Sequence, residues 1–503
     1  MSAMPRQIIQ LQSGQFNECT DAAERLLAPL IYTRAKRLVR IGVAPELPES
    51  LKKEIDRAPT AAAIIEVNAE FLRRQLNTLA DFRKFSRTRG QWEAADCPKD
   101  MANHILIAGN SPHFVLLSAI STAPFLREDL TICSTPGYDS ASGVFYAPNA
   151  NFPPIPEFPK KDDADAAIER LYQPFSQFPY ANDASRAAFL SHILTQVACH
   201  AIDTRPVGVY SAPNTGTGKS LLPTCIGLIA NGVEPALRAY TNVPEEMRKV
   251  LFSLLLAGDS MIHLDNVPSG SKVRSPALCA FVTANIYGDR KLGVSESPSL
   301  PNRCSVALTG NNITPAGDFA RRATIIRMDV NAETTRGRTF EIPNLKAYVL
   351  ANRPRMLVDA LIVIRAYSLA SDPVSLLPLP SFETWSRVAR DPIAWLGYGD
   401  AVESQDLETD DDIAPLRAAF TGLAESFAFG ATEFVSSDVA IHCSQSDGYT
   451  LKSLLQAAGC SDATDPLRVG YWLSAYKDRV AADLKLKKVG TTSGSARWKL
   501  THV

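Results

Sequence analysis

The stretch YSAPNTGTGKSLL (residues 210–222) closes on Gly-Lys-Ser, as phosphate-binding loops do. The usual pattern is G-x-x-x-x-G-K-[ST], and here Pro213 stands where the first glycine is expected. The apolar run VGVYS before the loop predicts a buried strand, and KSLLPTCIGLIANG after it predicts a helix that ends at Gly232. This strand–loop–helix context is the one that the motif requires. The residues expected to hold phosphates are Asn214, Thr215, Gly216, Thr217, Gly218, Lys219 and Ser220.

Each part of this loop has a physical role toward a nucleoside triphosphate. Successive backbone N–H groups and the helix N-terminus attract phosphate oxygens. Lys219 is placed to reach the β- and γ-phosphates, and the Ser220 hydroxyl to ligate Mg²⁺. Pro213 only opens the loop, so the missing glycine removes no phosphate donor. Pro223 falls in the first turns of the helix, where its ring and missing N–H predict a bent axis. A glycine-rich turn that binds nothing is the alternative.

A phosphate loop also needs a second strand that ends in an acid for the metal. SMIHLDN (260–266) supplies apolar residues and then Asp265. The next residue is Asn266, at the place where such strands often carry a glutamate that polarises the attacking water. An amide can orient water but cannot take its proton. Glu245 and Glu246, which precede this strand, are the candidate bases, with a solvated helix face as the alternative.

Polar residues near the next strands complete the candidate site. The predicted strand RCSVALTGNN ends in two asparagines; Asn312 is the first candidate for sensing a γ-phosphate and Asn311 the second. PAGDFARRATIIRMD places Arg321 and Arg322 just before another strand, with Arg322 as the first candidate and Arg321 as the alternative. An arginine at such a place can complete the nucleotide site of a neighbouring subunit and be worth about 10³–10⁵ in rate. The alternative for the pair is a surface salt bridge with Asp318.

The composition is that of an ordinary globular protein. The 503 residues suffice for about three domains, 46% of them are hydrophobic and 21% charged, and the formal net charge is -1. Bulk charge therefore does not indicate a nucleic-acid partner, and any basic surface has to be local. The nine cysteines are scattered, which predicts free thiols in a reducing cytoplasm. No apolar run predicts a signal peptide or a membrane span.

Proline-rich and acidic breaks divide the chain. The expected parts are an α+β N-terminal domain (1–160), a helical collar or linker (161–204), a block of alternating β and helical runs (205–400) and a C-terminal unit (413–503). The alternation in the third part predicts a mostly parallel sheet with flanking helices, an α/β fold. In the last part, helices precede LKLKKVGTTSGSARWKL, which predicts two strands around a Gly/Ser turn, the outline of a winged helix.

The ordered set PNTGTGKS, IHLDN, TGNN and GDFARR resembles that of AAA+ ATPases, and more narrowly that of the superfamily-three-like replicative helicases and primase-helicases of phages and integrative mobile elements. The resemblance is strong over residues 205–400 and weaker over 1–200. It implies an AAA+ P-loop core that uses ATP and Mg²⁺, and a homo-hexamer on single-stranded or forked DNA. It further implies a separate primase or replication initiator as partner, in the cytoplasm of a bacterial or phage-infected cell. Pro213, Pro223 and Asn266 depart from the family pattern, and Asn266 leaves the catalytic acid open.

The same resemblance implies that the segment between the acidic strand and the asparagine strand forms a hairpin that faces a central channel. NIYGDRKLGVSESPSLPNR fits, because its glycines and prolines suit turns. Arg290 and Lys291 are expected to touch the backbone of a DNA strand, with Lys272 and Arg274 as weaker candidates. Ordinary solvated charge is the alternative.

Positive charge also gathers near the C-terminus. The winged-helix interpretation places five cations on or near the wing, and it expects Trp498 to pack in the small core rather than stack on a base. The five are Lys485, Lys487, Lys488, Arg497 and Lys499. Such a module serves DNA contact and protein docking equally well.

Two functions from different classes fit these motifs. The first is an ATP-driven hexameric DNA helicase that moves along single-stranded DNA. The second is an ATP-switched replication initiator or regulator that binds DNA without unwinding it. The channel hairpin favours the first, and an unwinding assay separates them. A small-molecule kinase with a phosphate loop leaves the arginine pair and the C-terminal unit unexplained.

Overall fold

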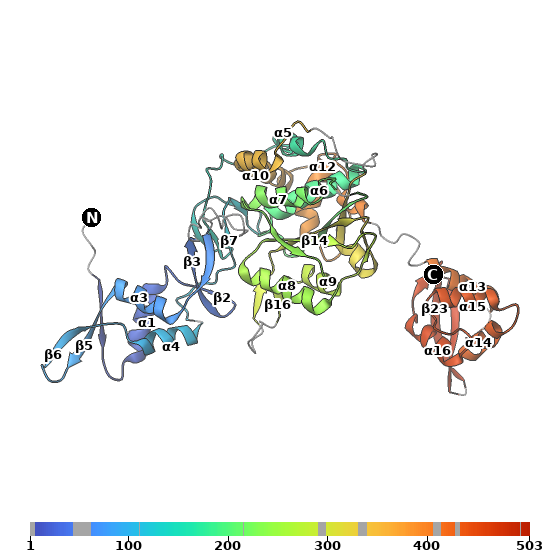
Figure 1. Cartoon of the computed structure of the whole chain (residues 1–503), viewed down its shortest axis with the longest axis horizontal. Coiled ribbons are helices and arrows are strands. Elements are labelled where there is room, and N and C mark those ends of the chain that lie inside the picture. The colour runs from blue at the N-terminus through green and yellow to red at the C-terminus, as the bar shows by residue number, and fades with distance from the viewer. Residues whose placement is uncertain are drawn as a thin grey trace. The chain divides into compact units, whose positions relative to one another are not determined.

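The computed structural model describes residues 6–43, 62–109, 111–214, 216–289, 298–329, 340–405, 414–427, 433–492 and 494–502 (Figure 1). The chain divides into two compact units, Met1–Gln405 and Asp406–Val503. No helix in the described ranges combines the length and apolar character needed to cross a bilayer. All nine cysteines are buried and unpaired, as the scattered spacing predicts.

A five-stranded sheet forms the centre of the first unit. Its order is β13-β14-β18-β12-β20 and every pairing is parallel, which confirms the expected mostly parallel α/β sheet. β12 is buried at every position, as parallel strands covered on both faces should be. The strands are β12 Val207–Ala212, β13 Ala236–Ala239, β14 Met261–Val267, β18 Ser305–Asn311 and β20 Ala323–Arg327.

Helices cover both faces of this sheet. Figure 1 shows α6, α7 and α10 on one side and α8 and α9 on the other. The helices are α5 Lys161–Tyr172, α6 Asp183–Val197, α7 Leu221–Asn231, α8 Pro244–Ala257, α9 Pro276–Val282, α10 Leu345–Ser368, α11 Glu383–Trp385 and α12 Asp391–Trp395. Short turns of other helix types are η1 Gln173–Phe175, η2 Gly317–Arg322, η3 Ser386–Arg390 and η4 Ala401–Ser404. Paired short strands are β15 Lys272–Val273 with β19 Thr314–Pro315, and β16 Ile286–Gly288 with β17 Ser299–Pro301.

The region expected to be a collar, 161–204, packs into the same hydrophobic core as the sheet. Nearly all of α6 is buried, and it lies against α7, β12 and β20. The sequence ASRAAFLSHILTQVACHAI explains this, because it is small or apolar around the whole helix rather than along one stripe. A helix of this kind is a core helix, and the spacing of its apolar residues alone does not reveal that.

Pro223 does not interrupt α7, which runs unbroken from Leu221 to Asn231. Pro223 is the third residue of the helix, and the first N–H groups of any helix have no intrahelical acceptor. Pro223 therefore removes no hydrogen bond from the helix interior, and the expected bend of the axis stays a prediction. Gly232 ends the helix in the left-handed conformation (φ 75°), as the sequence predicts.

The far end of α7 is held by Arg353 of α10. Its guanidinium donates to the carbonyls of Ile229 (3.2 Å) and Ala230 (3.1 Å), where the helix dipole is negative. The same group donates to Thr122 Oγ1 (3.1 Å) and Asn149 Oδ1 (2.5 Å) in the N-terminal part of the chain. Arg353 is 3% exposed, and burial lowers its pKa to about 10. One buried side chain thus ties three segments together.

The N-terminal part has hydrophobic clusters of its own. One of them lies under β1, α1, α3, β5 and α4. The elements are β1 Gln7–Leu11, α1 Phe16–Leu27, α3 Ala69–Leu79, β5 Ala80–Ser86, β6 Gln91–Ala95 and α4 Lys99–Ala108, with the sheet order β1-β5-β6. Smaller sheets contain β2 Tyr32–Arg34, β3 Arg37–Val43, β4 Ala62–Glu66, β7 Ala119–Ser121, β8 Phe125–Leu126, β9 Ile132–Cys133, β10 Gly137–Asp139 and β11 Val144–Tyr146. The expected mixture of helices and strands in this part is present.

The second unit is a helical cluster closed by a sheet. The two strands expected around the Gly/Ser turn are confirmed, β23 Leu484–Thr492 and β24 Ser495–His502. Trp498 is 2% exposed, which confirms its place in the core. The remaining elements are α13 Ala414–Ser426, β21 Phe434–Val435, α14 Ser436–Ser444, α15 Tyr449–Ala457, α16 Pro466–Ala475 and β22 Val480–Ala481, and the sheet order is β21-β24-β23-β22.

Three buried histidines of the first unit predict a loss of stability in mild acid. Burial lowers the pKa of His192 and His200 to about 3 and that of His263 to about 4. In the unfolded chain each titrates near 6.5, so below that pH the unfolded state binds protons that the folded state does not. The free energy of unfolding therefore falls as the pH falls, by about 1.4 kcal/mol per pH unit and histidine between roughly pH 6 and pH 4.

Urea unfolding at stepwise lower pH measures this slope. His200→Leu removes one titrating ring whose Nδ1 is buried without a hydrogen-bond partner, so its slope is expected to be about one third smaller. An unfolding free energy that stays constant from pH 7 to pH 5 contradicts the prediction.

Candidate functional site

The Gly-Lys-Ser loop connects the end of β12 to the start of α7, as the motif requires. Gly216 and Gly218 adopt left-handed conformations (φ 74° and 90°) that turn the backbone around the loop. Ser220 is the N-cap residue of α7. The N–H groups of Leu221 and Leu222 donate to Gly218 O (2.9 and 3.3 Å) and Pro223 has none, so the helix offers the positive end of its dipole there rather than free N–H groups. Lys219 and Ser220 are half-buried, Asn214 and Thr217 flank the turn, and Thr215 lies outside the described residues.

Gly218 is also required by a neighbour that is distant in sequence. A Cβ on Gly218 would lie 2.7 Å from Cε1 of Phe178, which belongs to the segment between α5 and α6. Phe178 and Pro174 line a cavity of about 250 Å³ beside the loop, closed on its other side by Ile342 and Pro343 before α10. The cavity is largely apolar and borders the loop where a nucleotide base would lie next to bound phosphates.

Asp265 lies near the carboxyl end of β14, in a local irregularity of the strand. Between Leu264 and Val267 the register to β18 shifts, so that one residue more is accommodated on β14. Asn266 takes up this shift with a left-handed backbone (φ 61°) and an exposed side chain. The result brings Asp265 Oδ1 within 3.4 Å of Ser220 Oγ, although the two residues are 45 positions apart.

β18 lies between β12, which leads into the loop, and β14, which carries Asp265. It supplies a hydroxyl that contacts Asp265. Thr309 Oγ1 donates to Asp265 Oδ1, and His263 Nε2 lies 3.0 Å from the same hydroxyl. Because burial lowers the pKa of His263 to about 4, its ring is neutral at pH 7. Neither Thr309 nor His263 carries a sequence signal beyond its place two residues from a strand end.

The charges of the loop and the acidic strand favour each other. Burial lowers the pKa of Lys219, and the nearby Asp265 carboxylate opposes that shift. Burial would raise the pKa of Asp265, but hydrogen bonds from Thr309 and from the Asn266 backbone outweigh it, so the net pKa lies below the usual value. Asp265 is therefore ionised at neutral pH. A carboxylate and a hydroxyl are oxygen ligands of the kind that Mg²⁺ prefers.

The candidate bases lie near the same edge of the sheet without joining the cluster. Ala239 of β13 pairs with Asp265, so the chain leaves β13 beside the acid and enters α8 at Pro244. Glu245 and Glu246 are exposed in the first turn of α8, and Glu246 forms an ion pair with Lys249 (2.7 Å).

The two asparagines after Thr309 differ in direction. Asn311 is the last residue of β18 and shares the sheet face of Thr309, since side chains two apart on a strand point the same way. It is half-buried, and its Oδ1 has no hydrogen-bond partner within the described part of the chain. Asn312 is exposed with φ 48°, and its backbone N–H donates to Ala212 O (3.0 Å).

The arginine pair contacts Asp318 in this single chain. Arg321 Nε donates to Asp318 Oδ1 at 2.7 Å, and Arg322 Nη1 contacts Oδ2 of the same carboxylate. The Arg321 side chain is 46% exposed and the Arg322 side chain 14%. Arg321 is thus the more exposed member of the pair.

The expected hairpin after the acidic strand is present in its arms, β16 and β17, which pair from Ile286 with Pro301 to Gly288 with Ser299. Arg290 and Lys291 lie outside the described residues. Lys272 in β15 and Arg274 directly after it are exposed. Their connection to the phosphate site is the pairing of β15 with β19, which follows Asn311 and Asn312 in the chain.

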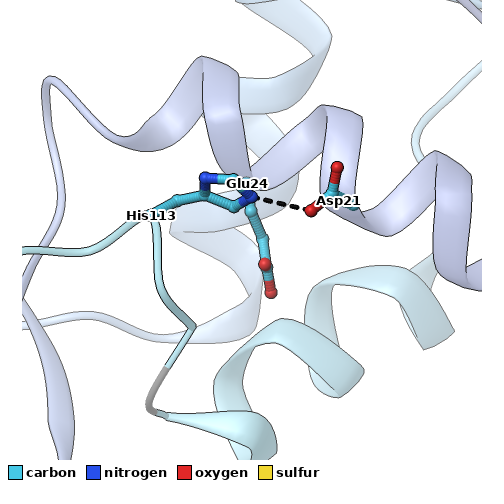
Figure 2. Close-up of side chains that lie close together, drawn as sticks. All are labelled: Asp21, Glu24 and His113. Carbon is cyan, nitrogen blue, oxygen red and sulfur yellow. Dashed lines mark hydrogen bonds and ion pairs between the residues drawn. The ribbon is translucent and has the colours of Figure 1, made fainter.

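One group of metal-type side chains lies far from this site, in the N-terminal part. Asp21, Glu24 and His113 place their ligand atoms within 4.8 Å of one another (Figure 2). Each has a protein partner: His113 Nε2 and Arg25 bind the two oxygens of Asp21 at 2.7 and 2.8 Å, and Ser111 Oγ donates to Glu24 at 2.5 Å. These bonds fasten the segment after α4 to α1, and they account for the cluster without an ion.

Comparison with known proteins gives helicases among structures of partly similar fold. The C-terminal region of NrS-1 in its apo form is 12% identical with a TM-score of 0.35, over 81% of this chain and 92% of that one. SCCmec type IV Cch, described as an active helicase, is 10% identical with a TM-score of 0.31, over 94% and 97%. JCV helicase is 11% identical with a TM-score of 0.22, over 53% and 72%. No protein-family model and no curated protein matches the chain. At these TM-scores the likeness carries no weight for function, which has to rest on the site.

Proposed function

We propose that this chain is an ATP-dependent hexameric DNA helicase that translocates on single-stranded DNA during replication of a phage or mobile genetic element. The observation that carries the proposal is the meeting of Ser220 and Asp265 at the carboxyl ends of parallel strands, beside a glycine loop and a helix N-terminus. Ligands of α/β sheets bind at this edge. The loop, the lysine, the hydroxyl and the acid are the parts that phosphoryl transfer from ATP requires.

Each group has a task in this proposal. The loop N–H groups and Lys219 hold the phosphates, and the cavity at Phe178 takes the purine base. Ser220 and Asp265 hold Mg²⁺, which neutralises charge that develops on the phosphates. Asn311, with its unpartnered Oδ1 on the Thr309 face, senses the γ-phosphate in preference to Asn312.

Asn266 orients the attacking water, and Glu245 or Glu246 takes its proton. Replacing that glutamate by glutamine is expected to slow hydrolysis more than Asn266→Ala does.

DNA binding and assembly follow from the same proposal. Arg290 and Lys291, which follow β16 in sequence, are expected to contact a DNA strand in the channel of a ring, with Lys272 and Arg274 as weaker candidates. The second unit serves as a winged helix. Its helices α14, α15 and α16 precede β24, and β24 pairs with β21. The partners are forked DNA and a separate primase or replication initiator, in the cytoplasm of a bacterial or phage-infected cell.

A strand-displacement assay on a forked duplex tests the proposal. ATP-dependent unwinding that stops when Mg²⁺ is chelated is the expected result. DNA binding that responds to ATP without any unwinding identifies the chain as a switch of the initiator class instead.

Thr309→Val tests the support of the metal site. Loss of the hydroxyl removes the hydrogen bond that orients the Asp265 carboxylate, so the carboxylate is held less well in the position of a metal ligand. The Mg²⁺ concentration for half-maximal hydrolysis is expected to rise by about tenfold or more, with the rate recovering at saturating Mg²⁺. Thr309→Ser keeps the hydroxyl and is expected to match the wild type. An unchanged Mg²⁺ dependence in the valine variant removes Thr309 from the site.

A further inference from the structure

The three-stranded sheet β1-β5-β6 in the N-terminal part has one face packed and one face open. Ile9, Ala80 and Phe82 point to the packed face and are 2–3% exposed above the helices. The register places the alternate side chains on the opposite, outer face, because paired residues share a face and the side-chain period is two. That outer face consists of Ile8, Gln10, Arg83, Phe85 and Trp92, with Asp81 and Ala94 at its margins.

Aromatic rings form the centre of the outer face. Phe85 and Trp92 are directly opposite each other on β5 and β6, with ring centroids 5.5 Å apart in an edge-to-face arrangement. Phe85 is 44% exposed and Ile8 48%. The hairpin extends beyond α1 and α3 and ends in a four-residue turn closed by Gly90 (φ 63°) (Figure 1). Phe85 is the exposed ring of the pair and Trp92 is half-buried.

Cations outnumber carboxylates on this hairpin although the chain as a whole has a net charge of -1. Arg6 and the hairpin residues 80–95 contain five cations and two carboxylates. The carboxylates are taken by the ion pairs Arg6–Asp81 (3.7 Å) and Arg89–Glu93 (3.1 Å). Arg83 and Arg87 are exposed and have no carboxylate partner in the described ranges. Arg83 lies two residues before Phe85 on the same face, about 7 Å away along the strand.

We infer that the outer face binds single-stranded nucleic acid, independently of the ATP site. Exposed aromatic rings stack on unpaired bases, and neighbouring arginines neutralise the phosphates between them. A duplex offers no free base faces to the rings, so the single strand is the occupant that uses both features. The excess of positive charge on this hairpin gives complementarity to phosphate, although the chain as a whole has a net charge of -1.

Fluorescence of the full-length chain without nucleotide tests this directly. Titration with an oligothymidine of about 16 nucleotides is expected to quench tryptophan emission through Trp92. Trp92→Phe keeps a stacking ring and is expected to bind with similar affinity but without this quench. Trp395→Phe, which removes a half-buried tryptophan under Lys161, is the matched control and is expected to keep it.

Anisotropy of the labelled oligonucleotide gives the affinity. Phe85→Ala is expected to weaken binding about fivefold or more, whereas Phe16→Ala, a control of similar exposure in the same part of the chain, leaves it unchanged. Arg83→Glu with Arg87→Glu is expected to reduce the slope of log affinity against log salt by about 0.7 for each lost phosphate contact. The titration contains no nucleotide, so a failure of the helicase proposal leaves this result standing.

Two results overturn the inference. One is wild-type affinity and salt dependence in both the Phe85 and the arginine variants. The other is a Trp92 quench that duplex DNA or vesicles of anionic phospholipid produce and the oligothymidine does not, which assigns the face to a duplex or a membrane surface.

Discussion

Lys219→Ala is expected to reduce ATP hydrolysis to background, by about a hundredfold or more. The loop loses its one side-chain cation, and the backbone N–H groups that remain carry only partial charges. Lys219 is half-buried in a loop that packs little, so the thermal midpoint of unfolding is expected to stay close to that of the wild type. Release of inorganic phosphate under saturating ATP and Mg²⁺ measures the loss.

The matched control is Lys99→Ala, which removes an exposed lysine at the start of α4, far from the loop in sequence. Its hydrolysis rate is expected to equal that of the wild type. Wild-type turnover in the Lys219 variant means that the loop is not the active site, and the proposed function loses its foundation with it.

The second large effect is expected at the arginine pair, and it connects chemistry to assembly. In the proposed ring, one of these arginines stabilises the phosphoryl group at the neighbouring subunit's loop. Arg321 is the better placed of the two, because its side chain is 46% exposed while that of Arg322 is 14% exposed. The Asp318 contact has to be released, and a surface ion pair of this kind is worth only about 0.2–1 kcal/mol.

Arg321→Ala is therefore expected to bind ATP almost normally and to hydrolyse it about 10³-fold more slowly or worse. Arg322→Ala removes a largely buried side chain and is expected to lower the thermal midpoint as well. Arg321→Lys restores little, because an ammonium cannot contact the phosphoryl oxygens bidentately.

Mixing separates action across an interface from a local effect. Arg321→Ala and Lys219→Ala are each inactive, but in a mixed ring some interfaces combine an intact Lys219 with an intact Arg321 from the next subunit. Those interfaces are expected to regain part of the hydrolysis after subunit exchange. Rings that form and exchange but stay inactive at every ratio rule out an arginine that acts between subunits.

What the sequence reveals of this site is what lies close together along the chain. The loop, the acid at the end of its strand and the arms of the hairpin are local patterns, and the structure places them as expected. The cavity beside the loop is lined by Phe178 and Ile342, which are far apart in the sequence, and Thr309 contacts Asp265 from another strand. No local sequence pattern contains either pair.

Single-residue detail also depended on the three-dimensional structure. Whether Asn311 or Asn312 faces the site is decided by where β18 ends, and a shift of one residue moves a side chain to the other face. Asn266 lies at a register shift between β14 and β18 that no sequence pattern predicts. The mostly parallel sheet itself was predictable, because its alternation of apolar runs and helices extends over two hundred residues.

Helix α7 begins directly after the phosphate loop, and its other end is bound by Arg353, so the helix connects the two. Its eleven residues span roughly 16 Å. A close-packed interior has low compressibility. A displacement of Ser220 is therefore expected to move the opposite end of α7 and not to be absorbed by the core. There the same guanidinium contacts Thr122 and Asn149, so the proposed function predicts that a nucleotide-driven shift of α7 reaches the N-terminal part. One buried side chain thus connects the helix that follows the proposed nucleotide loop to the N-terminal part of the chain.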